Sequence, residues 1–517
     1  MKKLFILSVA LMYMFNSSAQ ENMHIPGKKY QVWPHGVTYE IFVRSFADSN
    51  GDGIGDINGI AGKLGYLKDL GIEAIWLTPV SPSPTYHKYD VMDYYAIDKE
   101  YGTIDDFKNL VTEAHKLNIK IIPDIVVNHT SSQHPWFLEA MKGKDNPYRN
   151  FYIWKDSSEL SEQRNWYLPH DENRKPIEGQ KYYGFFSPGM PDLNYDNPKV
   201  REEVIKIGKY WLQQMGVDGF RLDAAQHIYD EKEVKKNVQW WNQFRSEMET
   251  VKKNVYLMGE VWNKDTVVAQ YLHNALSGCF NFDLSFILQD VARSEQPKNL
   301  IDKVIHIRNL YRKYNPDFID ATILSNHDQN RIMDDLKGDM NQAGMAAALL
   351  LTLPGSPYLY YGEEIGMQGQ KPDENIREPF LWDKGNRDKM QTKWMKAKYS
   401  TDKTVAPLSI QASDSSSMLN RYRFFLHERA RNEFLRSGEI EKSNISNPNV
   451  CAFYRVWEKD SVLVIHNLSR KEVTFELPAK EQAYVDPLFT YSSKYVRTKN
   501  KIRLSPFSTI ILVELEK

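Results

Sequence analysis

The segment DDFKNLVTEAHKLNIKIIPDIVVNH, residues 105–129, contains one complete structural repeat and decides the fold. Five apolar residues of its first half fall at helical spacing: Phe107, Leu110, Val111, Ala114 and Leu117. The second half, IKIIPDIVV, is mostly apolar, which is typical of a strand buried on both faces. A helix followed by such a strand predicts a parallel sheet that is covered by helices.

The same order recurs along the chain. Apolar residues at helical spacing precede the run VDGFRLDA at 217–224 and the run IEAIWLTPV at 72–80. Gly216 and Gly71 stand between helix and strand in these two repeats, where a glycine commonly ends a helix. Further short apolar runs are NVYLMGEVW at 254–262, ATILSNHD at 321–328 and SPYLYYGEE at 356–364. About eight such units over some 400 residues predict an α/β fold, a closed (β/α)8 TIM barrel.

Most of these apolar runs end in Asp, Glu, His or Asn. In a (β/α)8 barrel the carboxyl ends of the strands form the active site, because the loops that follow them lie at one face. We therefore expect the functional residues of this chain to be the polar residues at its strand ends.

Two regions break the alternation of helix and strand. Residues 130–190 are rich in Asn, Pro, Tyr and Trp without a sustained period, which predicts an inserted domain after the third strand. Residues 438–517 contain short alternating strands, which predict a C-terminal antiparallel β-sandwich domain. The barrel is then expected to comprise residues 20–129 and 191–437.

The N-terminus has the pattern of an export signal. MKK is followed by the apolar run LFILSVALMYMF and then by NSSAQ, where Ser17 and Ala19 have the spacing of a signal-peptidase site. We expect residues 1–19 to be a signal peptide and the protein to be exported, either periplasmic or secreted. The apolar run is about a dozen residues long and a bilayer needs about 20, so no membrane anchor is expected in the mature protein.

The net charge and the cysteine content of the chain limit which partners it is expected to bind and what can stabilise its fold. The formal charge is −1, and it becomes about −3 once Lys2 and Lys3 leave with the signal peptide. Such a balance indicates neither nucleic acid nor an anionic membrane as a partner. The two cysteines, Cys279 and Cys451, are far apart in sequence and cannot form a disulfide framework. A large hydrophobic core must stabilise the fold instead.

Several strand-end segments resemble the ordered signature regions of the α-amylase family. They are DIVVNH at 124–129, GFRLDAAQH at 219–227, GEVW at 259–262 and SNHD at 325–328. The segment MPDLN at 190–194 resembles the fifth region, in the form carried by relatives that are intermediate between oligo-1,6-glucosidases and neopullulanases. The segment GSPYLYYGEE resembles the eighth strand of the family. The resemblance spans nearly the whole mature chain, and it implies a (β/α)8 barrel that acts on α-glucans.

Cleavage of a glycosidic bond with retention needs a carboxylate nucleophile and a carboxyl acid/base about 5 Å apart. Asp223 and Glu260 end separate strands of the predicted barrel, so their side chains can converge at that distance. Arg221 lies two residues before Asp223, on the same face of the strand, where it can hold that carboxylate ionised. The resemblance implies that Asp223 is the nucleophile, Glu260 the acid/base and Asp328 a third carboxylate that binds sugar hydroxyls. The alternative is that these carboxylates form structural ion pairs.

The resemblance also implies a set of substrate-binding residues: Tyr89, His129, Arg221, His327, Gln226, His227 and His87. Tyr89 would stack on the sugar in the −1 subsite, and His129 and His327 would hydrogen-bond that sugar.

Three positions bear on how far the resemblance extends. Lys88 stands where relatives usually have Gly, and Gln226 stands where many α-amylases have a Lys that contacts the sugar. Ala224 follows the predicted nucleophile directly, where members that prefer α-1,6 bonds tend to have Val. The small residue therefore favours α-1,4 substrates.

The stretch DSNGDGIGD at 48–56 has the spacing of a calcium loop. Its predicted ligands stand at positions 1, 3, 5, 7 and 9 of the loop: Asp48, Asn50, Asp52, the carbonyl of Ile54, and Asp56. Hard oxygen ligands suit Ca²⁺, although Gly59 replaces the Glu that an EF-hand has at position 12. A solvated Asx-rich turn is the alternative. The resemblance implies a structural Ca²⁺, because the proposed chemistry needs no metal.

These observations lead to one main hypothesis and two alternatives. The main hypothesis is an exported retaining glycoside hydrolase that cleaves α-1,4-glucosidic bonds in starch-derived glucans or malto-oligosaccharides, as an α-amylase does. An α-glucosidase, a cyclomaltodextrinase or a transglycosylase would use the same intermediate. A non-catalytic sugar-binding relative would keep the barrel, but there one of the three carboxylates is expected to be replaced, and all three are present.

Overall fold

The computed structural model describes residues 35–160, 164–171, 173, 175–492 and 495–514. The predicted signal peptide lies outside these residues, so its prediction stands untested. Among the described residues no helix is long and apolar enough to cross a membrane. Both cysteines are buried and free.

Eight parallel strands close into a barrel in the order β1-β11-β10-β9-β8-β7-β3-β2. Their bounds are β1 Thr38–Ile41, β2 Ala74–Leu77, β3 Lys120–Ile125, β7 Gly219–Leu222, β8 Tyr256–Gly259, β9 Gly278–Phe280, β10 Ile319–Ile323 and β11 Ser356–Tyr360. The strands pair in parallel, as in the register of Thr38 with Ala74 on one side and with Tyr358 on the other. The predicted (β/α)8 barrel is confirmed.

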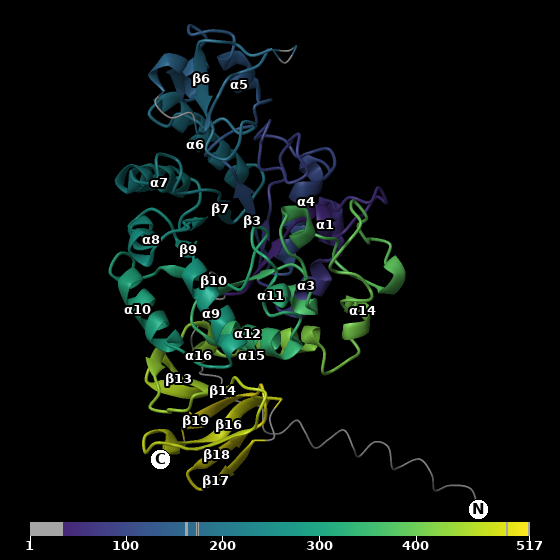
Figure 1. Cartoon of the computed structure of the whole chain (residues 1–517), viewed down its shortest axis with the longest axis vertical. Helices are drawn as coiled ribbons and strands as arrows, with labels where there is room; N and C mark the ends of the chain where they lie inside the picture. The colour runs from purple at the N-terminus through teal and green to yellow at the C-terminus, as the bar shows by residue number, and fades with distance from the viewer. Residues whose placement is uncertain (1–34, 161–163, 172, 174, 493–494, 515–517) are drawn as a thin grey trace, which may run out of the picture.

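Helices surround this barrel, except α5, which belongs to the segment between β3 and α6 (Figure 1). Their bounds are α1 Val43–Phe46, α2 Ile57–Gly62, α3 Leu64–Leu70, α4 Ile104–Lys116, α5 Pro135–Ala140, α6 Pro198–Gln213, α7 Val234–Glu249, α8 Asp265–Tyr271, α9 Phe282–Ser294, α10 Leu300–Arg312, α11 Ile332–Asp335, α12 Met340–Thr352, α13 Asp373–Ile376, α14 Leu408–Gln411, α15 Met418–Arg431 and α16 Glu433–Arg436.

Local sequence explains how these helices begin and end. Helix α4 starts at a capping box in which the hydroxyl of Thr103 accepts from the backbone N–H of Asp106, and the carboxylate of Asp106 accepts in return. Helix α3 ends at Gly71, whose φ of 99° lies in the left-handed region that glycine adopts without strain. The predicted repeat is therefore present, with helix and strand bounds within a few residues of the sequence pattern.

The interior of the barrel is filled by side chains. A buried apolar cluster is formed by residues that point inward from the strands or follow them: Ala74, Trp76, Ile122, Tyr256, Met258, Phe280, Phe282, Ile319, Ala321, Ile323 and Tyr358. The hydroxyls of Tyr256 and Tyr358 lie 2.6 Å apart across this interior. Because the interior is packed, the barrel has no pore, and a substrate can bind only at an open end.

The segment between β3 and α6 forms a small unit at one end of the molecule (Figure 1). It contains α5 and a three-stranded antiparallel sheet of β4 Trp154–Asp156, β6 Gln180–Tyr183 and β5 Trp166–Tyr167. An isolated bridge between His129 and Asp192 joins its two ends, and a second bridge joins Tyr152 in its interior to Leu193. The insertion therefore begins and ends beside the carboxyl end of β3.

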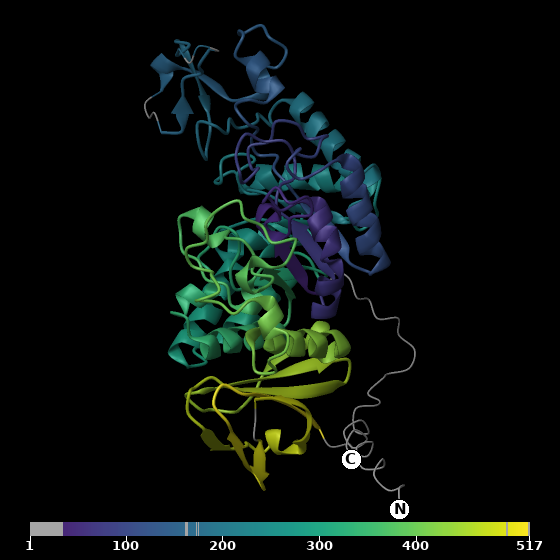
Figure 2. The same cartoon turned by 90° about the vertical axis from the view of Figure 1, so that its right-hand side faces the viewer.

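The C-terminal strands form two sheets that pack face to face. One sheet has the order β12-β13-β14-β19-β16 and the other β15-β18-β17. Their bounds are β12 Glu439–Lys442, β13 Val450–Trp457, β14 Asp460–Asn467, β15 Val473–Glu476, β16 Tyr484–Tyr491, β17 Val496–Thr498, β18 Lys501–Leu504 and β19 Thr509–Glu514. Apolar residues from both sheets share one core, which confirms the sandwich. Figure 2 shows it at the opposite end of the barrel from the insertion.

Candidate active site

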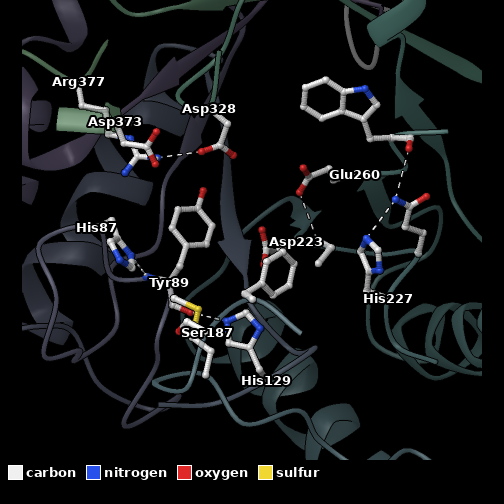
Figure 3. Close-up of a pocket in the computed structure, with 15 residues that line it drawn as sticks. His87, Tyr89, His129, Ser187, Asp223, His227, Glu260, Asp328, Asp373 and Arg377 are labelled. Carbon is white, nitrogen blue, oxygen red and sulfur yellow. Dashed lines mark hydrogen bonds and ion pairs between the residues drawn. The ribbon is translucent and has the colours of Figure 1, made fainter. Parts of the chain in front are cut away.

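A cavity of about 500 Å³ lies at the carboxyl ends of the barrel strands (Figure 3). It is lined by His87, Tyr89, His129, Phe186, Ser187, Met190, Asp223, Ala224, Gln226, His227, Glu260, Trp262, Asp328, Asp373 and Arg377. The structure thus brings together the three predicted catalytic carboxylates and five predicted substrate-binding residues. Residues from the barrel and from the insertion share this lining.

Two of the predicted substrate-binding residues lie behind the lining. Arg221 is 1 % exposed and His327 is fully buried. Both contact residues that do line the cavity: Arg221 donates to Asp223 and Glu260, and His327 lies beside Tyr89 and Asp328. That Arg221 and His327 bind the sugar stays a prediction.

Arg221 on β7 is the centre of the site. Its Nη1 donates to Asp223 at 2.6 Å and to both carboxylate oxygens of Asp124, and its Nη2 donates to Glu260 at 2.5 Å. Adjacent nitrogens of one guanidinium therefore hold Asp223 and Glu260, which follow the neighbouring strands β7 and β8. A planar fork of donors fixes the geometry of its carboxylate partners. Figure 3 shows the two carboxyl groups side by side.

Burial sets the protonation of this pair. It is the largest influence on Asp223 and, with the nearby charge of Asp124, raises the pKa of Asp223 to about 6 against the pull of Arg221. Burial also raises the pKa of Glu260, and the charge of Asp223 adds to the rise. The two groups interact and titrate as a pair, so one of them can hold a proton near neutral pH while the other is ionised.

Asp328 faces the pair from the loop after β10. Its Oδ1 accepts from Arg377 at 2.8 Å and its Oδ2 lies 3.1 Å from Nε2 of His327. Burial alone would raise the pKa of Asp328, but the charges of His327 and Arg377 outweigh it and hold that pKa well below its ordinary value. Asp328 is therefore a fixed anion.

Tyr89 is the aromatic wall of the pocket. Its hydroxyl donates to Asp124 at 2.9 Å, and its ring stacks on His327 with the ring planes 5° apart. Nε2 of His129 lies 3.0 Å from the backbone carbonyl of Tyr89, and burial lowers the pKa of His129 to about 4, so this ring is neutral and donates. Nδ1 of His87 accepts from the backbone N–H of Tyr89 at 3.1 Å. Both histidines thus position the tyrosine.

The structure shows how a lysine is accommodated at position 88, where relatives usually have a glycine. Its φ of 66° lies in the left-handed region, which glycine adopts freely and a lysine does not. The side chain is buried, and its ammonium pairs with Asp98 and Glu100, each at 2.8 Å. The charge of the lysine is therefore used to hold the loop that carries Tyr89, and not to contact a substrate.

Gln226 and His227 lie on the opposite side of the cavity from Tyr89. The amide of Gln226 donates to the carbonyl of Trp262 at 3.4 Å and accepts from Asn263 at 3.3 Å, so it is joined to the loop after β8. The ring of His227 stacks on Phe185 of the insertion with centroids 4.2 Å apart.

Ala224 has a backbone reason to be small. Its φ is 46°, and a β-branched residue in this left-handed region is strongly disfavoured. Its N–H lies 3.3 Å from Oε2 of Glu260. A residue without a branch at Cβ is therefore the less strained choice at this position.

Several lining residues were not predicted individually. Phe186 comes from the insertion, Trp262 follows Glu260 by two residues, and Asp373 and Arg377 come from the loop after β11. Of these residues, only Trp262 could have been identified from the local sequence, because it belongs to the segment GEVW. Long loops gave no periodic pattern from which the others could be identified.

The predicted calcium loop lies apart from this cavity, and none of its five predicted ligands lines it. Asp48 and Asp56 are buried at 3 % and 4 % exposure, and they accept from backbone N–H groups such as those of Gly53 and Gly59. Within the described part of the chain, no group of three or more His, Cys, Asp or Glu side chains could hold a metal. A Ca²⁺ ion would therefore need the amide oxygen of Asn50 and the carbonyl of Ile54, which suit a hard cation.

Two carboxyl groups with raised pKa values lie at the open end of a (β/α)8 barrel and share one arginine. This arrangement is typical of a glycoside hydrolase. Comparison with known families gives the particular family. Residues 40–438 match the alpha amylase catalytic domain, and residues 450–511 match the C-terminal domain of the alpha-amylase SusG. The chain is an enzyme of the α-amylase family, whose substrates are α-glucans.

Individual relatives agree with this assignment. Alpha-amylase 3 of Dictyoglomus thermophilum is 44% identical over 95% of each chain. A 4-alpha-glucanotransferase of Thermotoga neapolitana is 36% identical over 85% of this chain and 97% of its own length. The crystal structure of an alpha-amylase from H. orenii superposes with a TM-score of 0.83 at 42% identity and covers 93% of this chain and 99% of that one.

Proposed function

We propose that this protein hydrolyses α-1,4-glucosidic bonds of starch-derived glucans or malto-oligosaccharides with retention of configuration. The observation that carries the proposal is the shared contact of Arg221 with Asp223 and Glu260 at the edge of an open cavity. A retaining mechanism needs two carboxyl groups about 5 Å apart, and one guanidinium between them supports that spacing. The similarity to Alpha-amylase 3 supports the choice of bond.

In the first step, Glu260 would protonate the glycosidic oxygen while Asp223 attacks the anomeric carbon. The bond to the leaving sugar breaks, and a glycosyl ester forms on Asp223. In the second step, the ionised Glu260 takes a proton from water, which attacks the same carbon and releases Asp223. The raised pKa of Glu260 suits a group that must give and take a proton near neutral pH.

Asp328 would bind hydroxyls of the sugar in the −1 subsite and stabilise the positive charge that develops on its ring. Its two oxygens are fixed by Arg377 and His327, so the anion does not have to reorganise during the reaction. The ring of Tyr89 would stack on the same sugar, because an apolar face complements its C–H surface.

Transfer of the glycosyl group to another sugar is the second candidate function. The glycosyl ester on Asp223 would be the same, and a sugar hydroxyl would replace water as the nucleophile. The similarity to a 4-alpha-glucanotransferase favours this possibility. Exposed rings on the side of Glu260, such as Trp262 at 44 %, offer a surface on which an acceptor sugar could stack.

One set of assays tests both candidates. The Asp223→Asn variant should lose hydrolysis of maltotriose and starch almost entirely, and unchanged activity would exclude the assignment. Early products from maltoheptaose then separate the functions. Mixed shorter oligomers indicate internal hydrolysis, early glucose indicates attack from a chain end, and products longer than maltoheptaose indicate transfer.

We further propose that a Ca²⁺ ion stabilises the loop of residues 48–56, and that the protein is exported after cleavage behind Ala19. The spacing of hard oxygen groups in this loop supports the first proposal, together with the burial of two of its carboxylates, Asp48 and Asp56. The N-terminal apolar run supports the second. Luminescence of bound Tb³⁺ and mass spectrometry of the mature protein test these two points.

A further inference from the structure

The environment of His327 specifies how many protons its ring carries. Nδ1 lies 2.5 Å from Oε1 of Glu40; Glu40 is in β1, His327 is in the loop after β10, and both residues are buried. Nε2 lies 3.1 Å from Oδ2 of Asp328. A carboxylate oxygen can only accept a hydrogen bond, so both ring nitrogens face groups that require a donor.

The third neighbour of the ring has its own proton engaged elsewhere. The hydroxyl of Tyr89 lies 2.6 Å from Nε2 of His327 and donates to Asp124 at 2.9 Å. Its oxygen is then free to accept from Nε2. A neutral imidazole that donates from Nδ1 to Glu40 would turn the bare lone pair of Nε2 toward Oδ2 of Asp328, whereas the imidazolium places an N–H between this oxygen and the hydroxyl oxygen of Tyr89.

We infer that Glu40 is a positioning residue that holds His327 as an imidazolium, and that this cation fixes Asp328 as an ionised carboxylate toward the cavity. The inference deepens the proposed glycosidase function and rests on it for its effect on catalysis. Glu40 itself does not line the cavity and acts only through His327.

The charges around the ring agree with this assignment. The titratable and charged groups packed near it are Glu40, Tyr89, Asp124, Arg221, Asp328 and Arg377. Burial would lower the pKa of His327, but the charges of Asp328 and Glu40 outweigh it and raise this pKa to about 10. A neutral ring would leave the carboxylates of this cluster with only two guanidiniums, those of Arg221 and Arg377, as counter-charges.

The charge of His327 can be measured without any assay of activity. The protein is labelled at ¹³Cε1 of histidine, and the His327 signal is assigned by its loss in His327→Gln. We expect this signal to keep the shift of a protonated ring above pH 8, well past the ordinary histidine pKa of about 6.5. In Glu40→Gln the same ring should titrate at least about one pH unit lower. Titration of the wild-type ring at or below about pH 6.5, or no change in Glu40→Gln, would overturn the inference.

The effect on catalysis is measured as kcat/KM for maltotriose against pH. In Glu40→Gln the basic limb should move to lower pH by as much as the pKa of the ring falls, so that the loss grows with pH and is smallest at pH 5.5. An equal loss at every pH indicates a purely structural role and contradicts the inference. The substitution Glu40→Gln in a His327→Gln background should cause no further pH-dependent loss.

These experiments separate the inference from the function on which it rests. If the wild-type protein hydrolyses no α-glucan, the proposed function fails, but the titration of His327 still decides the charge of the ring. If Glu40→Gln does not fold, the wild-type titration decides alone, with Asp328→Asn as a second variant. Asp328→Asn should lower the pKa of the ring, yet leave the ring protonated at pH 7 because Glu40 remains.

Discussion

The ammonium of Lys88 lies 2.8 Å from the carboxylate of Asp98, and both side chains are buried. The same ammonium pairs with Glu100, which in turn accepts from Arg44 on α1. The loop that carries Tyr89 is therefore anchored to the first helix of the barrel by a network of charges. The ion pair compensates for the left-handed backbone that Lys88 is forced to adopt.

Substitution of Lys88 should separate backbone strain from the ion pair. Lys88→Met keeps the strain and leaves Asp98 buried without its cation, which typically costs about 3–5 kcal/mol. Lys88→Gly loses the same ion pair but relieves about 1 kcal/mol of strain, so it should unfold at a higher temperature than Lys88→Met. Thermal unfolding measures the difference, and the exposed Lys99→Met serves as the control. Equal melting temperatures for Lys88→Met and Lys99→Met would show that the pair contributes nothing.

The acidic limb of the pH profile should depend on Asp124. The nucleophile must be ionised, and Asp223 has a pKa raised to about 6 by burial, with a further contribution from the charge of Asp124. Asp124→Asn removes this negative charge and therefore lowers the pKa of Asp223. The acidic limb of kcat/KM should then move to lower pH by about half a unit to one unit. A shift to higher pH would mean that the loosened Arg221 dominates the result.

Trp262 should contribute to the affinity for the substrate. The ring lines the cavity, is 44 % exposed and stacks on Phe282 with centroids 4.3 Å apart. Trp262→Ala should raise KM for maltotriose by about 2- to 12-fold, the equivalent of a stacking contribution of about 0.5–1.5 kcal/mol. Tyr314→Ala is the control, because that ring is 37 % exposed and does not line the cavity. A similar rise in both variants would argue against a specific contact.

Removal of Ca²⁺ should affect stability and leave the chemistry intact. Chelation is expected to lower the melting temperature by a few degrees or more, because an ion that binds only the folded state stabilises it. Activity per folded molecule at low temperature should change little, since the proposed reaction uses carboxylates alone. In Asp48→Asn the chelator should have no further effect. Rapid loss of activity in a protein that remains folded would contradict a structural role.

The sequence predicted most of the barrel because buried parallel strands need long apolar runs, and these are visible without a structure. Strands β1 and β9 were not among the predicted runs, because Thr38–Ile41 and Gly278–Phe280 are short and give no such run. The strand-end carboxylates Asp223 and Glu260 were predicted for a related reason. Once the strands are known to be parallel, their carboxyl ends must meet at one face of the barrel.

The loops could not be predicted in the same way. Phe186 and Arg377 reach the cavity from the insertion and from the segment after β11, where the sequence has no period. Their positions depend on contacts with distant parts of the chain, such as the bond from Arg377 to Asp328. The sequence pattern located these regions but did not identify the residues.

The sequence alone determined the parallel barrel and the terminal sandwich and predicted the three carboxylates, because apolar periodicity and short motifs are local properties. Only the tertiary structure decided which groups surround those carboxylates and what charge they carry. Glu40 and His327 are 287 positions apart and meet because barrel closure places β1 near β10, with only β11 between them. Burial then makes that contact strong, since little water remains to screen it.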